Sequence, residues 1–255
     1  MTAIASLRAD SSQGREVGAQ PALSALRSSP WFAGWPPSAL ASLSMTSSLR
    51  SFGTGQPVAA EGKGLGAVVL VIKGRLRAVR RAEGGREVTL ESFRAGDLAA
   101  DALFDPATAL PDDWIAAETS LLLFIPREEF LSQLRLVPEA ALTLARDYEK
   151  RLTRAKGLAT GLVLSDVETR LYNALCNLAR EEGEDTADGT VIGRCPTQQE
   201  LGNTIGACRE TVSRIIAELA RRSLLTLRGR RLTLTPAFFQ QNGAGQSSEP
   251  QPPSA

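Results

Sequence analysis

The chain carries two kinds of hydrophobic pattern, which divide it near its middle. From Phe52 to Ile125, apolar and polar residues alternate over short segments; Val88 and Leu90, for example, stand between charged or polar neighbours. Glycine-containing turns separate these segments at intervals of roughly 8–12 residues. A period of two is typical of half-buried β-strands, and several short strands in succession predict a small β-barrel or β-roll.

After Pro126 the apolar spacing lengthens to the period of an α-helix. One long helix is predicted from Glu139 to Leu164, and Ser165 with Glu168 has the spacing of a capping box that begins the next helix. The long helix has an apolar stripe at Leu144, Tyr148, Leu152, Ala155, Ala159 and Leu162. Two interpretations stay open: the stripe packs on the chain's own barrel, or it is the seam of a homodimer.

A winged helix-turn-helix is predicted beyond the long helix. Thr197 and Glu200 fit a second capping box, which begins a short helix, and Gly206 supplies a turn residue that tolerates positive φ. The next helix, Cys208–Leu219, has one apolar side and a roughly opposite polar side. Residues 224–234 then alternate around a basic tip, which is the pattern of a hairpin wing.

The polar side of this second helix carries the chemistry of DNA recognition. Arginine matches the O6 and N7 acceptors of guanine, and a carboxylate accepts from cytosine N4, so Arg209, Glu210 and Arg214 are predicted to contact bases. Hydroxyls, amides and wing arginines suit phosphates. The predicted phosphate contacts are Thr197, Gln199, Thr211, Ser213, Arg228, Arg230 and Arg231. The alternative is a solvated helix face on which Glu210 pairs with Arg214.

The net charge of the whole chain does not indicate DNA as a partner, but the charge of its C-terminal part does. The 255-residue chain has 29 Lys and Arg against 28 Asp and Glu, a formal net charge of +1. Between residues 194 and 239, however, eight arginines stand against three glutamates. Double-stranded DNA is therefore the expected partner of this part of the chain.

The rarer residues exclude several function classes. Histidine is absent, which excludes His-based acid–base catalysis and His-ligated zinc or haem. Cys176, Cys195 and Cys208 are too few to ligate a typical iron–sulfur cluster, and their odd number argues against a secreted disulfide framework. No nucleophile–base constellation is recognisable. We expect a protein that is not an enzyme and holds no metal or cofactor.

The sequence predicts an α+β protein with a β-roll, a long helix and a winged domain. No stretch has the length and hydrophobicity of a signal peptide or membrane span, so we expect a soluble, cytoplasmic protein without a membrane partner. The predicted parts are a disordered tail (1–30), a β-roll (31–136), a dimerisation helix (137–164), a winged helix-turn-helix (165–239) and a second disordered tail (240–255).

The stretch from Thr197 to Arg214 is very similar to the recognition motif of the bacterial transcription regulators that include the cyclic AMP receptor protein and the fumarate–nitrate regulator, the CRP/FNR family. Weaker similarity to the family's β-roll, a cyclic-nucleotide-binding jelly roll, lies at Phe52–Gly55, Glu61–Gly62, Lys73–Gly74 and Phe93–Asp97. The resemblance implies a homodimer on a palindromic site with GTG-containing half-sites about 10 bp apart. Transcription regulation through RNA polymerase is also implied.

The ligand pocket departs from the family pattern. Cyclic-nucleotide binders of this family carry a Gly-Glu pair and, about ten residues later, Arg-Ser or Arg-Thr. The corresponding residues here are Ala100 and Asp101, followed by Asp112 and Asp113, and no Arg occurs between Ala95 and Pro126. On the long helix, Ala155 and Lys156 replace a hydroxyl pair. Carboxylates repel a phosphate, so control by cyclic AMP is not expected.

Two functions of the remaining charged residues stay open. The roll is an alternative sensor for another effector, such as a cyclic dinucleotide, with Lys156, Arg77 and Arg80 as candidate phosphate ligands. The acidic segment Glu181–Asp188 is predicted to be a loop and is a candidate contact of RNA polymerase. Solvated surface charge is the simpler interpretation of both sets.

Overall fold

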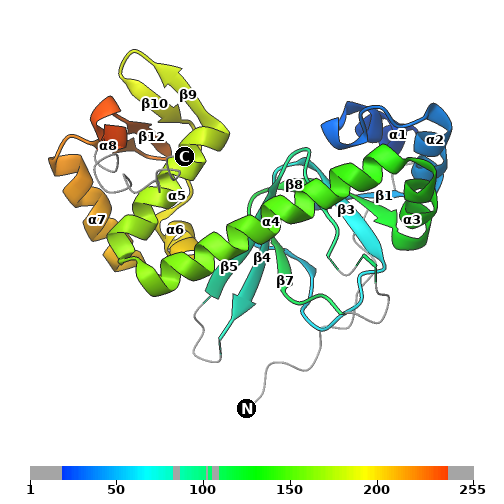
Figure 1. The fold of residues 1–255 in the computed structure, drawn as a ribbon, viewed down its shortest axis with the longest axis horizontal. Coiled ribbons are helices and arrows are strands. Elements are labelled where there is room, and N and C mark those ends of the chain that lie inside the picture. Colours follow the sequence, from blue (N-terminus) through cyan, green and yellow to red (C-terminus); the bar gives the residue numbers. More distant parts are fainter. Residues whose placement is uncertain (1–18, 83–86, 102, 105–108, 241–255) are drawn as a thin grey trace, which may run out of the picture. The chain divides into compact units, whose positions relative to one another are not determined.

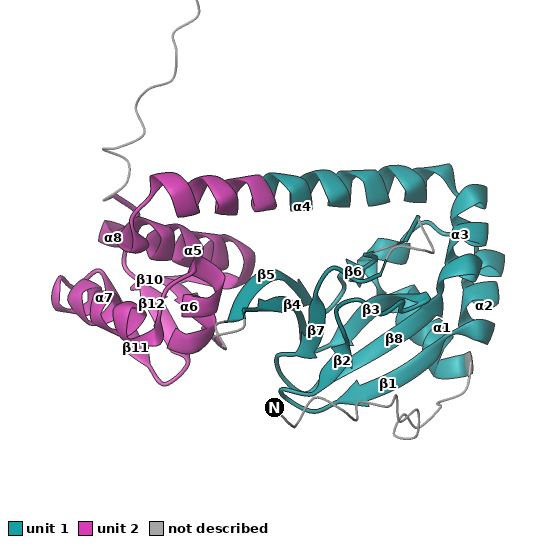
Figure 2. Cartoon of the chain, turned by 90° about the horizontal axis from the view of Figure 1, so that it is seen from below, with its two compact units in different colours: residues 1–153 teal, residues 154–255 magenta. Residues whose placement is uncertain are grey.

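The computed structural model of the chain describes residues 19–82, 87–101, 103–104 and 109–240. The chain divides into two compact units, residues 1–153 and residues 154–255 (Figure 2). The predicted α+β fold is confirmed: short helices and the strands of a β-roll make up the first part, one long helix follows, and a winged helix-turn-helix comes last (Figure 1).

In the first unit, the described strands form two antiparallel four-stranded sheets. One sheet has the order β1-β8-β3-β6 and the other the order β2-β7-β4-β5. The strands are β1 (Ser48–Phe52), β2 (Pro57–Ala59), β3 (Ala67–Lys73), β4 (Arg75–Arg81), β5 (Glu87–Arg94), β6 (Leu98–Ala99), β7 (Asp113–Ala116) and β8 (Ser120–Pro126).

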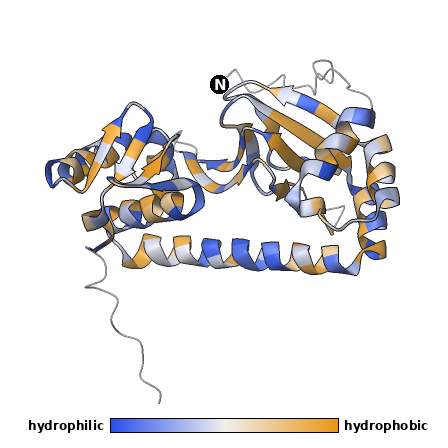
Figure 3. Ribbon diagram, turned by 90° about the horizontal axis from the view of Figure 1, so that it is seen from above, coloured by the Kyte–Doolittle hydropathy of each residue, from blue (hydrophilic) through white to orange (hydrophobic). Residues whose placement is uncertain are grey.

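The strand sequences explain how the two sheets enclose a core. Side chains of a strand point alternately to its two faces. On β3, Val69 and Val71 accordingly join a cluster with Trp114 that draws residues from both sheets, whereas Val68 and Leu70 join a second cluster shared with the helices of this unit. Strands β3 and β8 are mostly hydrophobic, and the strands of the roll as a whole mix hydrophobic and hydrophilic residues (Figure 3).

The N-terminal part of the described chain corrects one prediction. Residues 1–30 were expected to be a disordered tail, but Ala19–Ser28 forms helix α1, in which Ala22 and Leu26 are fully buried. These two residues are one helical turn apart, so they present a single apolar face, and that face packs into the helical cluster of the roll. The polar composition of residues 1–30 suggested disorder, but a few apolar residues are enough to hold a helix that packs against a neighbouring surface. Residues 1–18 lie outside the described residues.

Short helices complete this unit around a cluster of aromatic side chains. They are the 3₁₀ helix Pro30–Phe32, α2 (Pro37–Thr46) and α3 (Arg127–Leu136). Trp31, Phe32, Trp35 and Phe130 lie with neighbouring ring centroids 5.1–6.1 Å apart. Large aromatic rings contribute much buried area per residue, so this cluster holds the helices on the roll.

The predicted long helix is confirmed as α4, Pro138–Leu164, with 27 residues. Its N-terminal half, which belongs to the first unit, packs on that unit. The Trp31 indole donates to Asp147 at 2.9 Å, and the Tyr148 hydroxyl donates to the carbonyl of Ala100 at 2.7 Å. Together with buried Leu144, these contacts fix this half of the helix to the roll.

The residues of the predicted seam therefore behave in two ways. Leu144 is 5% exposed and Tyr148 is half-buried, so both pack within their own unit, as the alternative interpretation of the stripe expected. Leu152 is 56% exposed and Leu162 is 47% exposed. Ala155 and Ala159 are exposed as well. Within the predicted stripe, the residues that a single chain leaves in water are therefore those from Leu152 to Leu162.

The second unit combines helices with one antiparallel sheet of order β11-β12-β10-β9. Its core gathers apolar residues from the helices that follow α4 and from three of these strands, among them Leu171, Ile192, Leu201, Ile216 and Leu234. Besides the end of α4, its elements are α5 (Val167–Glu182), β9 (Gly183–Thr186), β10 (Gly189–Ile192), α6 (Gln198–Ile205), α7 (Arg209–Arg221), β11 (Leu225–Arg228), β12 (Arg231–Leu234) and α8 (Pro236–Gln240).

Two local predictions in this unit are wrong. The helix cap before α5 is Asp166 rather than Ser165: the Asp166 carboxylate accepts the Thr169 backbone N–H at 2.7 Å. This bond lowers the pKa of Asp166. The acidic segment 181–188 is not a loop but the end of α5 and a hairpin, in which the Thr190 hydroxyl donates to Asp185 at 2.8 Å. A hairpin tolerates acidic residues at this sheet edge because their side chains face water.

Candidate nucleic-acid interface

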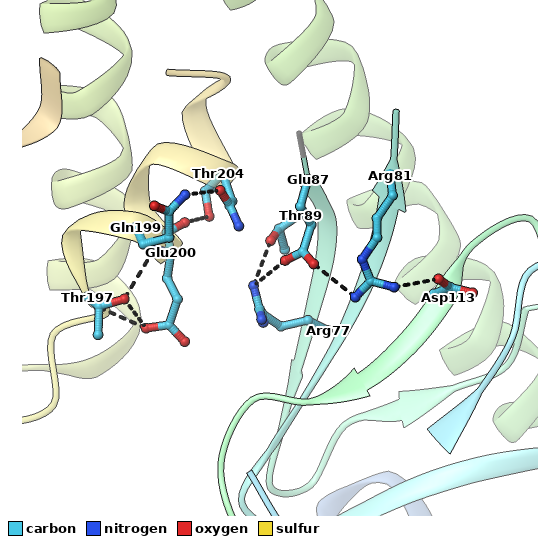
Figure 4. Close-up of polar contacts among 10 residues, drawn as sticks. Arg77, Arg81, Glu87, Thr89, Asp113, Thr197, Gln199, Glu200 and Thr204 are labelled. Atoms are coloured by element: carbon cyan, nitrogen blue, oxygen red, sulfur yellow. Dashed lines mark hydrogen bonds and ion pairs between the residues drawn. The ribbon is translucent and has the colours of Figure 1, made fainter. Parts of the chain in front are cut away.

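Helix α6 begins at the predicted capping box. The Thr197 hydroxyl accepts the backbone N–H of Glu200 at 3.2 Å, and the Glu200 carboxylate accepts the backbone N–H of Thr197 at 2.8 Å (Figure 4). The Thr197 hydroxyl also donates to this carboxylate at 2.9 Å, and the Gln199 amide donates to Asn203 at 2.8 Å. Both residues predicted to bind phosphate thus have partners within their own helix, although both remain exposed.

The turn between α6 and α7 is tight and depends on two glycines. Gly206 has φ of 69°, in the left-handed region that favours glycine. The Ala207 N–H donates to the carbonyl of Gly202 at 2.9 Å, and a Cβ on Gly202 would lie 2.7 Å from the Ala207 carbonyl oxygen. A side chain at Gly202 would push the turn away from α6, and a side chain at Gly206 would strain the left-handed backbone. The two glycines therefore set the angle at which α7 leaves the turn.

Helix α7 presents the predicted base-contacting residues to water. Val212, Ile215, Ile216 and Leu219 are buried on one side. Arg209, Glu210 and Arg214 are exposed, whereas Thr211 and Ser213 are half-buried at its flank. In the part of the chain that the structure describes, no ion pair joins Glu210 to Arg214, so the pairing considered as the alternative does not form in the free chain.

The electrostatics at the start of α7 keep Glu210 ionised. The pKa of Glu210 lies below its ordinary value because its own backbone N–H in the first helical turn hydrogen-bonds the carboxylate, with a smaller contribution from Cys208. Cys208 is exposed, and its thiol lies 3.1 Å from the Thr211 hydroxyl. At neutral pH, α7 therefore offers two arginine forks and one carboxylate acceptor.

The predicted wing is present as β11 and β12. Its tip turns at Gly229, whose φ is 62°, and Arg228, Arg230 and Arg231 are exposed around it. The Arg230 Nε donates to the carbonyl of Cys195 at 3.2 Å, and the Cys195 N–H donates to the Arg230 carbonyl at 2.8 Å. Part of Arg230 thus holds the wing tip to the segment that leads into α6.

A groove of about 470 Å³ brings the three parts of the interface together. Arg209 of α7, Arg230 of the wing and the first turn of α6 all contribute to it. Its remaining surface comes largely from buried apolar residues such as Leu201 and Leu232. Arg209 and Arg230 thus bring two cationic side chains to one hollow surface, and cationic side chains suit an anionic backbone.

In the first unit, the residues of the predicted degenerate pocket are ion-paired. Asp101 contacts Arg151 of α4 at 3.0 Å. Arg151 also contacts Glu91 at 3.0 Å and donates to the carbonyl of Leu98 at 2.9 Å. Ala100 is buried beside them. Arg151 thus ties α4 to three segments of the roll.

Asp112 and Asp113 are also paired, with arginines of β4. Asp112 lies 2.9 Å from Arg80, and Asp113 lies 2.9 Å from Arg81. Burial raises the pKa of Asp112, and the Arg80 guanidinium opposes this shift. These partners are not predictable from the local stretch, because Arg80 and Arg81 lie more than 30 residues before the two aspartates. The pairing of β4 with β7, which aligns Val79 with Asp113, brings these residues together.

The candidates for an alternative effector site have different surroundings. Arg77 pairs with Glu87 at 3.3 Å and donates to Thr89 at 3.2 Å (Figure 4). Ala155 and Lys156 are exposed on the part of α4 that belongs to the second unit. Arg77 and Arg80 are therefore engaged with carboxylates in the ligand-free chain, whereas Lys156 lies in water.

The described residues offer no group of three or more His, Cys, Asp or Glu side chains placed to hold a metal ion. None of the described helices is both long enough and apolar enough to cross a lipid bilayer.

Both parts of the chain match known protein families. Residues 49–136 match the cyclic nucleotide-binding domain, and residues 169–236 match the Crp-like helix-turn-helix domain. A CRP-like cAMP-activated global transcriptional regulator of Mycobacterium tuberculosis is 28% identical over 205 residues, which cover 80% of this chain and 91% of the relative. The cAMP-activated regulator CRP of Haemophilus influenzae is 29% identical over 167 residues, 64% of this chain and 73% of the relative.

Solved structures share the same fold. A CooA mutant from Carboxydothermus hydrogenoformans matches with a TM-score of 0.65 at 22% identity, covering 74% of this chain and 84% of its own. The c-di-GMP responsive global regulator CLP of Xanthomonas campestris matches with a TM-score of 0.62 at 25% identity, covering 74% of this chain and 94% of its own.

Proposed function

Because this chain belongs to the CRP/FNR family of bacterial transcription regulators, we propose that it binds specific DNA as a homodimer, on a palindrome with GTG-containing half-sites. The observation that carries this proposal is the exposed face of α7, where Arg209, Glu210 and Arg214 stand together without ion-pair partners among the described residues. Desolvating a charge that has no partner is unfavourable, so an exposed charged face suits a polar, charged ligand such as DNA.

Each group on α7 and the wing has a role in this complex. With α7 in the major groove, the two arginine forks donate to guanine O6 and N7, and ionised Glu210 accepts from cytosine N4. Arg228, Arg230 and Arg231 at the wing tip contact phosphates, as do Thr197, Gln199, Thr211 and Ser213 near the helix starts. The base contacts select the sequence, and the phosphate contacts fix the register.

We propose that the dimer forms through the exposed part of α4. Leu152, Ala155, Ala159 and Leu162 leave apolar surface in water at helical spacing, and a two-fold axis lets the same stripe cover itself in a second copy. Two recognition helices then meet two half-sites about 10 bp apart on one side of the duplex. Leu144 is left out of this seam because it is buried in its own unit.

The roll is not a cyclic AMP site in this proposal. Cyclic AMP needs a cation for its phosphate, and the carboxylates at this place, Asp101, Asp112 and Asp113, already bind the nearby arginines. Admitting an anion would break these pairs and add repulsion. The regulator is therefore expected to bind DNA without cyclic AMP, although the Mycobacterium tuberculosis relative is named as cAMP-activated.

A second candidate is a regulator controlled by a cyclic dinucleotide. It is favoured by the similarity to the c-di-GMP responsive regulator of Xanthomonas campestris. The exposed Lys156 is available to a phosphate, whereas Arg77 and Arg80 would have to leave their carboxylate partners. Saturating dinucleotide must raise the melting temperature if it binds the folded chain, so an unchanged melting temperature excludes this candidate.

We further propose a cytoplasmic protein that contacts RNA polymerase when bound to DNA. The β9–β10 hairpin is a candidate contact because Glu184 and Asp185 are exposed on it. Replacing both carboxylates by amides would then lower transcription without changing DNA affinity. The proposal includes no catalytic activity, since the family consists of regulators rather than enzymes.

The test of DNA recognition is fluorescence anisotropy with a palindromic GTGA-type duplex and a scrambled duplex of the same length. About 150 mM salt suppresses binding that rests on phosphates alone. The proposal predicts a clear preference for the palindrome, and a single half-site duplex should bind much more weakly. Equal affinity for palindromic and scrambled duplexes would overturn the proposed sequence recognition.

A further inference from the structure

Arg170 makes an unusual pair of contacts within the second unit. It lies in the first turns of α5, and its Nε donates to the carbonyl of Ile205 at 2.8 Å while its Nη1 donates to the carbonyl of Ser165 at 2.6 Å. Ile205 is the last residue of α6, directly before the helix-turn-helix turn. Ser165 follows directly after α4. One guanidinium therefore joins the ends of two helices.

The chemistry of both acceptors favours an arginine at this place. Carbonyls in the last turn of a helix lack partners within the helix and carry partial negative charge. A cation that donates to them forms charge-assisted hydrogen bonds, which are roughly twice as strong as neutral ones. Lysine has no planar fork and cannot hold two separate acceptors in fixed directions.

Packing supports the same link between the end of α4 and the turn. A Cβ on Gly206 would lie only 2.9 Å from Leu162 Cδ2 of α4, so the α4 side chain reaches the turn glycine closely. On the other side, a Cβ on Gly161 would lie 3.9 Å from the Arg170 side chain. The last turn of α4 thus contacts both Arg170 and the turn that precedes α7.

We propose that Arg170 is a positioning residue that fixes the recognition helix α7 to the end of α4. This inference rests on the proposed DNA binding. Since α4 also carries the exposed stripe proposed for the dimer, a fixed joint between α4 and the turn sets the separation of the two recognition helices. Arg170 then determines how strictly the protein discriminates the spacing between half-sites, without itself touching DNA.

The first test needs no DNA. In Arg170→Gln, hydrogen exchange of the amides at the end of α6 and in the turn, residues 205–209, should speed up by about tenfold, the loss expected for one charge-assisted hydrogen bond. Exchange in the wing strands should stay as in the parent chain. Faster exchange throughout the second unit would show a general loss of stability, and unchanged exchange at the turn would show no joint; either result overturns the proposal.

The second test measures half-site spacing. Palindromic duplexes are compared with duplexes in which one base pair is inserted or removed between the half-sites. The parent chain should prefer the correct spacing, and Arg170→Gln should lose most of that preference while its affinity for a single half-site changes less than about twofold. The spacing preference of Arg170→Lys should lie between those of the parent chain and Arg170→Gln, because lysine keeps the charge but not the fork. If Arg170→Gln does not fold, the comparison of Arg170→Lys with the parent chain serves as the test.

Arg180→Gln is the matched control on the same helix. Arg180 is exposed and contacts only the side chain of Asn177 in the described structure, at 3.4 Å, so its loss should leave spacing preference unchanged. An Arg170→Gln variant that keeps the parent's spacing preference would overturn the role of Arg170 alone. A parent chain that prefers no duplex would overturn the proposed DNA recognition instead.

Discussion

The roll of the first unit and the α7 and wing surfaces of the second unit use arginine in opposite ways. In the roll, Arg77, Arg80, Arg81 and Arg151 each bind a carboxylate of the same unit. On the exposed face of α7 and on the wing, by contrast, four arginines form no ion pair with any residue that the structure describes: Arg209, Arg214, Arg228 and Arg231. A charge that is already paired must lose its partner before it binds a ligand, whereas a solvated charge loses only water.

This difference teaches that charged residues in one chain can serve internal cohesion in one place and stay available to a ligand in another. In the roll, Asp101 and Glu91 share the guanidinium of Arg151, which connects this region to α4. Helix α7, which we propose to contact DNA, has an open, charged face. The largest expected effects of mutation therefore concern the stability of the first unit and the ligand affinity of the second.

Arg151→Met should have the largest effect, and it should act on stability. The Arg151 side chain is 17% exposed, and its removal leaves Asp101 and Glu91 without their shared cation. The free energy of unfolding of the first unit should fall by about 2–3 kcal/mol. Tryptophan fluorescence reports on this unit alone, because Trp31, Trp35 and Trp114 all lie in it.

Arg146→Met is the control for that change, since Arg146 is exposed on the same helix. It should shift the midpoint of denaturation little. If both variants unfold at the same denaturant concentration as the parent chain, Arg151 does not hold α4 to the roll, and the ion pairs there are surface contacts of little energetic weight.

Arg214→Ala should have the next largest effect, and it should act on DNA. Loss of one bidentate base contact costs about 1–3 kcal/mol of discrimination, so the preference for the palindrome over scrambled DNA should shrink. Anisotropy with both duplexes measures this ratio. Arg221→Ala, in the last turn of the same helix, should preserve it. Equal losses on both duplexes would assign Arg214 to a phosphate rather than to a base.

Arg231→Ala at the wing tip should have a smaller, sequence-independent effect. Neutralising one phosphate contact reduces the slope of log affinity against log salt by about one and weakens palindromic and scrambled duplexes alike. Arg230→Ala should do the same and also release the wing tip from the Cys195 carbonyl. A salt slope that does not change in Arg231→Ala would remove the wing tip from the interface.

Asp112→Asn should have the smallest effect, visible as a pH dependence. Burial raises the pKa of Asp112 in the folded chain above its ordinary value of 3.8. A raised pKa contributes stability that is fully present below the unfolded value and lost as pH rises through the folded value. Relative to the parent, the Asn variant should therefore gain melting temperature from pH 4 to pH 7. A difference that shrinks over this range would show that the Arg80 attraction outweighs burial.

The recognition part could be predicted from the sequence because its signals are local. The capping box of Thr197 and Glu200, the glycine turn and the basic hairpin each lie within a few residues, and each fixes one piece of backbone. The long helix and the strands followed from periodicity in the same way. Local patterns thus gave the α+β fold and placed the base-contacting candidates on one exposed face.

The parts that sequence reasoning missed depend on contacts between distant segments. Asp101 and Arg151 are 50 residues apart, and Asp113 and Arg81 are 32 apart, so only the strand register and the packing of α4 bring them together. Helix α1 was missed because its stability comes from a partner surface rather than from its own composition. The Arg170 joint was missed because hydrogen bonds to backbone carbonyls leave no residue pattern.

Titration of the labelled palindromic duplex with the parent chain, in the presence and absence of millimolar cyclic AMP, tests the contrast between the two units most directly. If the ion pairs of the roll exclude cyclic AMP and the charged face of α7 is available to DNA, the chain should bind the palindrome tightly and with the same affinity in both titrations. Binding that appears only with cyclic AMP would mean that the ion pairs of the roll open to admit the nucleotide, and it would contradict this account.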